Sequence, residues 1–310
     1  MGDKALVAVI MPVFNVEKYI VQALNSLLNQ TYEEWLCYIV DDCSTDNTLN
    51  IIKLTVGEDA RFLIKEVGCN SGRPSIARNL AISECKGEYV AFLDGDDYWH
   101  VDKLKKQVEM MENNEAALCF TGMVAIDQYS IIKKRYDHKQ VIGNYFASLL
   151  VKNSIATSSV MIRLSSLNKL AEPCFDSLIK IGEDYDLYLR LASKFDFCSL
   201  NEVLVFWRDH ELSLTKASAK EIANDLAKVF IKIPDYCHNV SDYQNEMNVF
   251  QANINYYFAK NEVERGELAT ARKLLFPSIF VSYKVMALWV SLLFGAKAWG
   301  LIHVIKKKLP

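Results

Sequence analysis

The chain has 310 residues, of which 51% are hydrophobic and 24% charged, with 12 glycines and 6 prolines. This composition excludes a largely disordered, collagen-like or low-complexity protein, and it suits one large α/β domain with an appendage or two modest domains. The formal net charge is −3, and residues 1–267 carry 28 basic against 38 acidic side chains, so nucleic acid is not expected as a partner.

The first third of the chain alternates between buried strands and amphipathic helices. The predicted strands cover residues 5–14, 35–42, 61–67 and 87–94, and the predicted helices cover residues 16–29, 44–54, 74–85 and 101–112. Continuous apolar runs such as "ALVAVIMPVF" indicate strands that are covered on both faces. The βαβαβαβ order therefore predicts a mainly parallel sheet with helices on both sides.

Carboxylates follow two of these strands. Asp41 and Asp42 end the second strand, and Asp94 and Asp96 follow the fourth in a D-x-D turn that continues with Asp97. Ligands of open α/β sheets bind beyond the carboxyl ends of the strands, so we expect a site there. The Asp94–Asp96 pair suits Mg²⁺ or Mn²⁺, and Asp42 is a candidate acceptor for a pyrimidine N–H. For Asp97 alone, a role in the turn or in capping the next helix is the better interpretation.

Two arginines lie between the third and fourth strands. Gly72 permits an unusual backbone conformation beside Arg73, and Arg78 lies one turn into the helix that Pro74 begins. A guanidinium group near a helix N-terminus is suited to binding a diphosphate. For Arg78, a salt bridge to the acidic cluster is an equally good interpretation.

The middle of the chain, about 115–215, is less regular. Its expected elements are a strand near 116–123, a helix near 144–153, a β-rich stretch over 155–164, a helix over 183–193 and a strand over 199–210. Glu183 and Asp184 open the second helix, where carboxylates either pair with the helix dipole or act as a general base toward an acceptor hydroxyl. Arg208 and His210 end the last strand and are candidates for contact with a diphosphate or a metal.

From about residue 216 the pattern is helical, with a hairpin over 248–276 that turns at Arg265 and Gly266. The last 43 residues contain seven Lys or Arg and no Asp or Glu. Their longest uncharged run, 285–296, is shorter than the roughly 20 residues of a spanning helix. We therefore favour an interfacial amphipathic helix on an anionic membrane surface over a helix packed on its own domain or a true span.

The eight cysteines show no CxxC spacing, and no signal peptide or myristoylation motif is recognisable at the N-terminus. Buried free thiols in a cytoplasmic chain are therefore expected.

Five motifs, taken in order, resemble those of inverting glycosyltransferase family two, whose members have the GT-A fold. They are "VIMPVFNVEKYIVQALNSLLNQTY", "IVDDCSTDNT", "GRPSIARNLAI", "GEYVAFLDGDDYW" and "GEDYDLYLRLA". The resemblance covers about residues 5–215 and implies a Rossmann-like α/β domain over 1–215, with a mainly parallel sheet flanked by helices. A helical extension over 216–275 and an amphipathic, basic, membrane-associating tail over 276–310 complete the expected organisation.

The resemblance also implies roles for individual residues. The expected nucleotide-sugar site comprises Pro12, Phe14, Glu17, Asp42, Arg73, Arg78 and Asp94. Asp96 and His210 are the expected ligands of Mn²⁺ or Mg²⁺. Asp184 resembles the catalytic base, Glu183 the residue that places the acceptor, and Arg208 part of a segment that closes over the diphosphate. Within that segment, Glu211 and Leu212 depart from the family pattern.

The implied function is transfer of a hexose from a UDP-sugar to a lipid-diphosphate-linked saccharide acceptor. The expected hexose is glucose or galactose. Such enzymes build O-antigen or capsule-type polysaccharides at the cytoplasmic face of the inner membrane. One alternative is a phosphohydrolase or receiver-type domain, whose acidic motif differs from the Asp96-Asp97-Tyr98 run found here. The other is a non-catalytic nucleotide-sugar-binding or membrane scaffold protein, in which loss of Asp96 or Asp184 is expected. The sequence does not indicate an oligomeric state.

Overall fold

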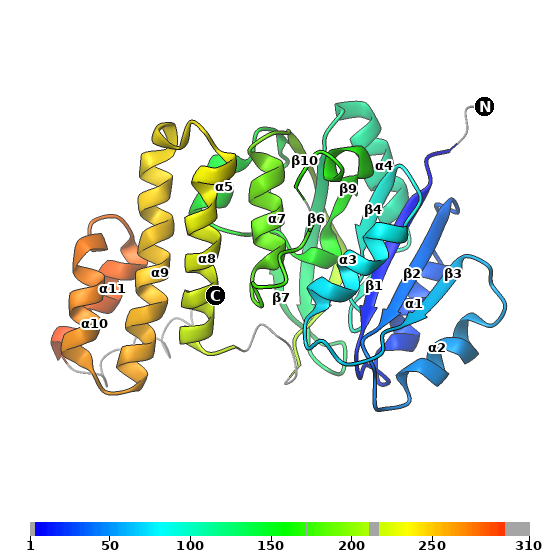
Figure 1. Cartoon of the computed structure of the whole chain (residues 1–310), viewed down its shortest axis with the longest axis horizontal. Helices are drawn as coiled ribbons and strands as arrows, with labels where there is room; N and C mark the ends of the chain where they lie inside the picture. The colour runs from blue at the N-terminus through cyan, green and yellow to red at the C-terminus, as the bar shows by residue number, and fades with distance from the viewer. Residues whose placement is uncertain (1–3, 172, 211–216, 295–310) are drawn as a thin grey trace. The chain divides into compact units, whose positions relative to one another are not determined.

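The computed structural model describes residues 4–171, 173–210 and 217–294 (Figure 1). Its contacts divide the chain into two compact units. Unit 1 comprises Met1–Tyr145 and Ser154–Ser213, and unit 2 comprises Phe146–Asn153 and Leu214–Pro310. Residues 146–153 therefore group with the C-terminal helices, which the sequence pattern did not indicate. The three-part division at 215 and 275 stays a prediction.

Unit 1 is built on one sheet. Its strands are β1 (Val7–Val13), β2 (Trp35–Asp41), β3 (Phe62–Glu66), β4 (Tyr89–Phe92), β5 (Tyr98–Trp99), β6 (Leu118–Ile126), β7 (Ile132–Tyr136), β8 (Ile142–Gly143), β9 (Met161–Arg163) and β10 (Phe197–Arg208). The order is β3-β2-β1-β4-β9-β6-β10-β5, with β7 beside β6 and β8 beside β10. Strands β1, β2, β3, β4, β6 and β10 run in one direction, and the antiparallel β9 separates β4 from β6. The predicted mainly parallel sheet is confirmed.

Helices flank this sheet. Those of unit 1 are α1 (Ile20–Leu28), α2 (Thr48–Val56), α3 (Pro74–Glu84), α4 (Lys103–Asn114), the 3-10 helix η1 (Thr157–Ser159), α6 (Leu164–Leu167) and α7 (Glu183–Ala192). On β1, Val9 and Met11 belong to the same buried cluster as residues of α1, α2 and α4. Ala8 and Ile10 point to the opposite face, where they are also fully buried and where α3 packs on β1 and β2.

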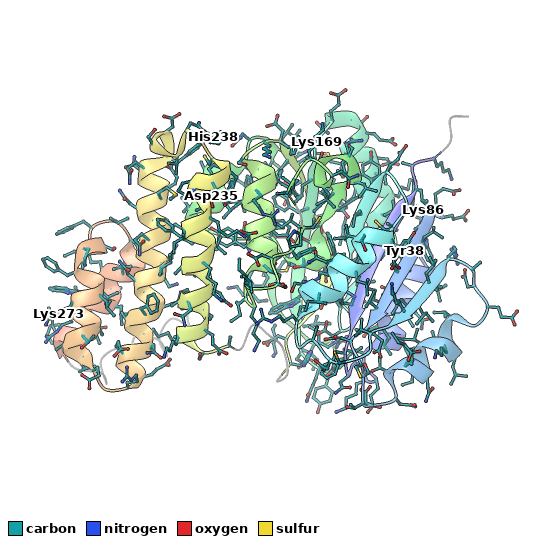
Figure 2. The ribbon with its side chains drawn as sticks, viewed as in Figure 1. Tyr38, Lys86, Lys169, Asp235, His238 and Lys273 are labelled. Atoms are coloured by element: carbon teal, nitrogen blue, oxygen red, sulfur yellow. The ribbon has the colours of Figure 1, made fainter. Side chains whose placement is uncertain are left out.

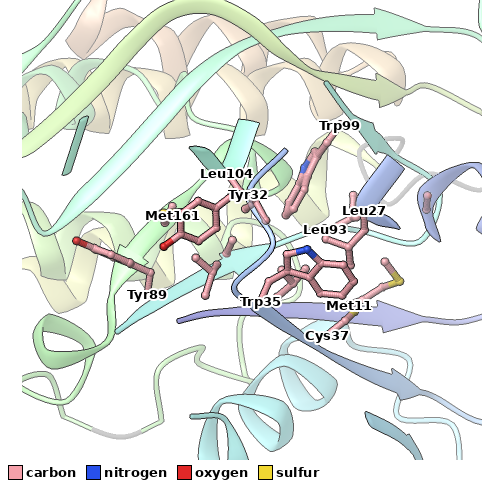
Figure 3. Packing of buried hydrophobic residues seen from close by; sticks show 14 of the residues in the cluster. Met11, Leu27, Tyr32, Trp35, Cys37, Tyr89, Leu93, Trp99, Leu104 and Met161 are labelled. Atoms are coloured by element: carbon pink, nitrogen blue, oxygen red, sulfur yellow. The ribbon is translucent and has the colours of Figure 1, made fainter. Parts of the chain in front are cut away.

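The main core lies between the sheet and α1, α2 and α4. Figure 3 shows Met11, Trp35 and Cys37 packed together within it. All eight cysteines are free thiols, as the sequence predicted; Cys37, Cys119, Cys198 and Cys237 are buried, whereas Cys69 is exposed and the prediction of burial is wrong for it. Burial of a small hydrophobic thiol is the usual state of a cysteine that takes no part in chemistry.

Helix α1 begins four residues later than predicted. The structure starts it at Ile20, whereas the apolar period favoured a start at Val16. Asn15 adopts a left-handed conformation with φ 51°, and the backbone N–H groups of Val16 and Glu17 donate to Thr48 Oγ1 at the start of α2 and to Asp46 Oδ2 in the loop before it. Residues 17–19 form a turn, and these two bonds tie the end of β1 to the segment that begins α2.

Unit 2 is helical, as predicted. It contains α5 (Phe146–Val151), α8 (Ala219–Tyr236), η3 (Val240–Tyr243), α9 (Gln244–Glu264), α10 (Leu268–Leu275), η4 (Phe276–Ser278), α11 (Tyr283–Ser291) and η5 (Leu292–Phe294). The hairpin between α9 and α10 turns at Gly266, whose φ of 84° favours glycine. Among residues 4–171, 173–210 and 217–294, no helix combines the length and hydropathy needed to cross a bilayer. Glu211, Leu212 and the predicted tail after Phe294 lie outside the described residues.

One lysine of the helix predicted to be charged and amphipathic is fully buried. Lys103 is 0% exposed, its Nζ donates to Gln107 Oε1 at 2.6 Å, and it lies 3.9 Å from the centre of the Trp99 ring. Burial lowers the pKa of Lys103 to about 7, although nearby Cys119 raises it. Buried ammonium groups lose hydration, so this lysine destabilises the fold whenever it is charged.

We expect Lys103→Met to raise the free energy of unfolding by about 1–2 kcal/mol at pH 6–7, after the lost bond to Gln107 is counted. The native pKa of about 7 lies below the unfolded value of about 10.4, so the unfolded chain binds more protons between these values. The destabilisation is complete below pH 7 and disappears as pH rises toward 10. Urea unfolding at pH 6, 8 and 10 measures this, with exposed Lys105→Met as the matched control. An equal gain at all three pH values contradicts the explanation.

Candidate active site

Side-chain hydrogen bonds join the loops that follow β1 and β2. Asn15 N donates to Ser44 Oγ at 3.0 Å, Thr45 N donates to Asn15 Oδ1 at 2.8 Å, and Asn47 N donates to Glu17 Oε2 at 3.0 Å. These bonds satisfy backbone groups that neither the strands nor α2 satisfy. The loops that follow β1 and β2 are therefore fixed to each other at the carboxyl ends of the central strands, and we call residues 14–19 and 42–47 the braced edge.

Three predicted nucleotide residues lie on or beside this braced edge. Pro12 is half-buried within β1, and Phe14 is 42% exposed just beyond the strand end. Glu17 holds the loop before α2 through Asn47. An exposed aromatic ring beside a rigid loop offers a face on which a base can stack. Glu17, by contrast, has a structural partner that the sequence did not indicate.

Asp42 lies at the end of β2 and is buried. Ser71 donates to both of its oxygens, from the backbone N to Oδ1 at 3.0 Å and from Oγ to Oδ2 at 2.9 Å. The adjacent Asp41 accepts from Ser44 in the same way, which makes it part of the turn. Arg73 donates to the carbonyl oxygen of Ser177. Ser71 thus fixes the direction of the Asp42 carboxylate, and no sequence motif pointed to it.

The acidic turn after β4 contains three carboxylates with different surroundings. Asp94 accepts from Arg78 Nη2 at 2.7 Å, and Asp96 Oδ2 lies 2.8 Å from His210 Nε2. Asp97 is buried and accepts from Ser158 Oγ at 2.5 Å and from Arg208 N at 2.8 Å. Burial raises the pKa of Asp97 well above its ordinary value, and the charges of Asp96 and Asp94 raise it further. Asp97 is therefore the structural member of the trio, as the sequence suggested.

Arg208 lies inside the protein with 1% exposure. Its guanidinium donates to the Asp96 carbonyl oxygen at 2.9 Å, the Asp127 carbonyl oxygen at 3.0 Å and Gln22 Oε1 at 2.6 Å. It also stacks 4.7 Å from the centre of the Tyr19 ring. Through the Asp96 carbonyl oxygen, this buried guanidinium fixes the backbone of the acidic turn from inside the protein. The sequence suggested that the Arg208 guanidinium contacts a diphosphate directly. In the structure its donors are instead bonded to protein oxygens in the interior.

Arg78 connects the acidic turn to the start of α7. The buried guanidinium donates through Nη2 to Asp94 and through Nη1 to Glu183 Oε1 at 2.9 Å. Although burial lowers the pKa of Arg78, these two carboxylates raise it overall, so the side chain stays charged. The salt bridge that the sequence left open is present, and it joins three segments that are far apart in the chain.

Asp184 is held by the hydroxyl-bearing helix η1. Thr157 Oγ1 donates to Asp184 Oδ2 at 2.9 Å, and the next residue, Ser158, accepts from the Asp94 backbone N at 3.2 Å. Helix η1 thus links the acidic turn to α7, in addition to the Arg78 bridge. The run "ATSS" was the only sequence signal for Thr157 and Ser158, and it resembled an ordinary strand segment.

The carboxylates at the start of α7 are unusually basic. Burial raises the pKa of Glu183 to about 7, the charge of Asp184 raises it too, and Arg78 lowers it. Burial also raises the pKa of Asp184, while the hydrogen bond from Thr157 and the charge of Arg78 lower it. A carboxylate poised in this way is suited to accept a proton near neutral pH.

The donor set at the acidic turn fits a divalent cation with few protein ligands. Asp96 offers a hard oxygen, and His210 an imidazole nitrogen close to it. Across the part of the chain that the structure describes, no three His, Cys, Asp or Glu side chains are grouped as a metal cage. Mg²⁺ and Mn²⁺ commonly take one or two carboxylates and complete their shells with substrate phosphates and water. The residues are consistent with that kind of site.

Comparison with known proteins identifies the family. A sequence profile described as Glycosyl transferase family 2 matches residues 8–168. TuaG of Bacillus subtilis, named as a teichuronic acid biosynthesis glycosyltransferase, is 36% identical over 66% of this chain and 79% of its own. WfaP of Escherichia coli is 32% identical over 73% of this chain and 88% of its own.

The fold has solved relatives. S. aureus TarS 1–349, crystallised with UDP, aligns with a TM-score of 0.70 and 21% identity over 94% of this chain and 87% of that one. At this identity the likeness concerns the fold, and it supports the GT-A arrangement of a mainly parallel sheet with flanking and C-terminal helices. The chain belongs to glycosyl transferase family 2.

Proposed function

We propose that this enzyme transfers glucose or galactose from a UDP-sugar to a lipid-diphosphate-linked saccharide, with inversion and with help from Mn²⁺ or Mg²⁺. The product is a repeat unit of an O-antigen or capsule-type polysaccharide, made by a peripheral enzyme at the cytoplasmic face of the inner membrane. WfaP and WfgD support this choice, because both are named UDP-Glc:alpha-D-GlcNAc-diphosphoundecaprenol beta-1,3-glucosyltransferases.

The observation that carries the proposal is the double connection between the acidic turn and the start of α7. Arg78 joins Asp94 to Glu183, and η1 joins the backbone of Asp94 to Asp184. A donor-binding carboxylate and a basic carboxylate are thereby held in fixed relation. This is the arrangement that an inverting displacement needs, because the acceptor proton leaves on the side opposite the diphosphate.

For the donor we propose the following contacts. Phe14 stacks on the uracil, Asp42 accepts from its N–H, and Asp94 faces the ribose. Pro12 and Glu17 shape the same edge, and Arg73 approaches the nucleotide. Because Ser71 and Arg78 hold the Asp42 and Asp94 carboxylates before the donor arrives, binding costs little side-chain ordering.

For the transfer step we propose that Asp184 removes the proton of the acceptor hydroxyl as that oxygen attacks the anomeric carbon, while Glu183 places the acceptor. Asp96 and His210 would hold the cation, which when bound offsets the negative charge on the departing diphosphate. Arg208 is a positioning residue that keeps Asp96 at the edge of the sheet through its backbone carbonyl. The eight cysteines have no part in this chemistry.

A transfer assay tests the proposal. UDP-glucose and UDP-galactose are offered with a synthetic GlcNAc-diphospholipid acceptor, with Mn²⁺ or Mg²⁺ and with EDTA, and the linkage formed is determined by NMR. Transfer that requires a divalent cation and inverts the anomeric centre supports it. UDP binding without transfer to any lipid-linked acceptor contradicts the substrate assignment.

We expect Asp96→Ala to lower the rate of transfer at least a hundredfold, because loss of one precisely placed electrostatic partner costs about 10²–10³ in rate. His210→Ala is expected to have a smaller effect and to raise the Mn²⁺ concentration that gives half-maximal activity. The matched control is Asp137→Ala, because native Asp137 is an exposed carboxylate that pairs with Arg135 on the surface. If the metal requirement of Asp96→Ala equals that of the native enzyme, Asp96 is not a metal ligand.

A further inference from the structure

Helix α11 is apolar on both of its faces. Val285 and Leu288, together with Leu292 of the following η5, are fully or almost fully buried against α9 and α10. Tyr283, Met286 and Val290 are exposed, and their i, i+3, i+7 spacing places them on one stripe. A helix that only packs on its own domain needs one apolar stripe, so the second stripe calls for another partner.

Aromatic side chains of neighbouring segments extend this outer stripe. Phe276 of η4 is exposed and its ring centre lies 6.4 Å from that of Trp289. Phe280 is 92% exposed, and Phe294 at the end of η5 is 77% exposed. Single exposed hydrophobic residues are ordinary, but such a group within twenty residues marks an interaction surface. We call the exposed residues Phe276, Phe280, Tyr283, Met286, Val290, Leu293 and Phe294 the outer apolar face.

From Leu268 onward, the charged residues of the segments that carry the outer apolar face are all positive. Arg272, Lys273 and Lys284 are its charged neighbours in the sequence, and no Asp or Glu follows Glu267. Lys284 Nζ lies 4.0 Å from the centre of the Tyr256 ring, and Figure 2 shows Lys273 on α10 pointing away from α9. Exposed aromatic and aliphatic side chains in segments whose charges are lysine and arginine match the boundary between anionic headgroups and acyl chains.

We infer that the outer apolar face is the surface with which this enzyme docks on an anionic lipid bilayer. The inference deepens the membrane association in the proposed function, and assigns it to η4, α11 and η5 of the described chain. A second copy of the same chain is a poorer occupant, because a symmetric contact would bring the same positive charges together. Insertion of Phe280 and Phe294 supplies the apolar contribution, and the basic residues supply the preference for anionic lipid.

Vesicle co-sedimentation of the full chain tests this inference. Vesicles of phosphatidylcholine alone and of phosphatidylcholine with 30% phosphatidylglycerol (about the anionic range at which polybasic segments bind) are compared. Phe280→Ser with Phe294→Ser is expected to reduce the bound fraction on anionic vesicles about fivefold or more. Leu54→Ser with Ile231→Ser is the control, because those side chains are also strongly exposed but lie on α2 and α8. UDP-sugar hydrolysis is measured alongside and is expected to be unchanged in both variants.

The outcomes separate the alternatives. The double variant Phe280→Ser with Phe294→Ser is here called the face variant. Loss of vesicle binding in the face variant, but not in the control, supports the inference. Equal binding of the native chain and the face variant overturns it. Equal binding to neutral and anionic vesicles overturns the lipid preference. If the native chain binds no vesicles and is a dimer by sedimentation equilibrium that the face variant dissociates, the occupant is a second copy. Because hydrolysis is scored separately, failure here leaves the transferase proposal intact, and absence of transfer leaves the docking result intact.

Discussion

Replacing Asp184 by asparagine is expected to lower the rate of sugar transfer by about 10²–10⁴, the usual contribution of a general base. The amide keeps the shape of the carboxylate and still accepts from Thr157, whose Oγ1 donates to Asp184 Oδ2. UDP affinity, measured by calorimetry, is expected to stay within about twofold of the native value, since only the proton acceptor is lost. An Asp184→Asn enzyme with native transfer rates removes the assignment of this residue as the base.

Thr157→Val provides a finer test of the same assignment. The hydrogen bond from Thr157 lowers the pKa of Asp184 against the effect of burial, so its loss is expected to raise that pKa. The pH range over which kcat/KM rises, as Asp184 loses its proton, then moves to higher pH. Above that range kcat/KM returns to the native value. A variant whose rate falls equally at every pH would show that Thr157 merely supports the fold. Thr157→Ser, which keeps the hydroxyl, is expected to restore the native profile.

The sequence predicted the parts of the site that depend on strand ends. Asp42 and Asp94 follow buried strands whose apolar runs are unmistakable, and parallel strands end at one edge, so their neighbourhood follows from topology. Asp184 was predicted because a motif and a helix start coincide there. In each case the relevant information is local: a period, a turn and a residue type within about ten positions.

The residues that the sequence did not predict act through long-range packing. Ser71, Thr157 and Ser158 are small hydroxyl residues, common in any loop, and only the fold brings them to the carboxylates. Lys103 occurs in a run of charged residues, and its burial depends on Trp99 and Gln107. Arg208 was expected at the ligand, yet its donors are used within the protein. Charge and polarity in a sequence state what a side chain can do, while burial decides which partner it meets.

Replacing Arg78 by methionine is expected to reduce the free energy of unfolding by about 3 kcal/mol, within the range for breaking a buried ion pair. The loss comes from leaving Glu183 buried at 9% side-chain exposure without its positive partner, while Asp94 at 31% keeps some contact with water. Urea unfolding at pH 8 measures the change. Arg135→Met, which breaks a surface pair with Asp137, is the control and is expected to cost less than about 1 kcal/mol.

Adding Glu183→Gln to Arg78→Met is expected to restore at least about 1 kcal/mol of the free energy of unfolding that Arg78→Met loses. Residues in one network couple by about 0.5–3 kcal/mol. Native Glu183, with a pKa of about 7, retains its proton at pH values where the unfolded chain, near 4.3, has released it. The native state therefore binds more protons between these values, and the stability that Glu183 contributes falls as pH rises from about 4.3 to 7. Glu183→Gln should flatten that slope. If the single and double variants are equally unstable at pH 8, the cost of removing Arg78 is lost packing, and the buried charge of Glu183 is not its cause.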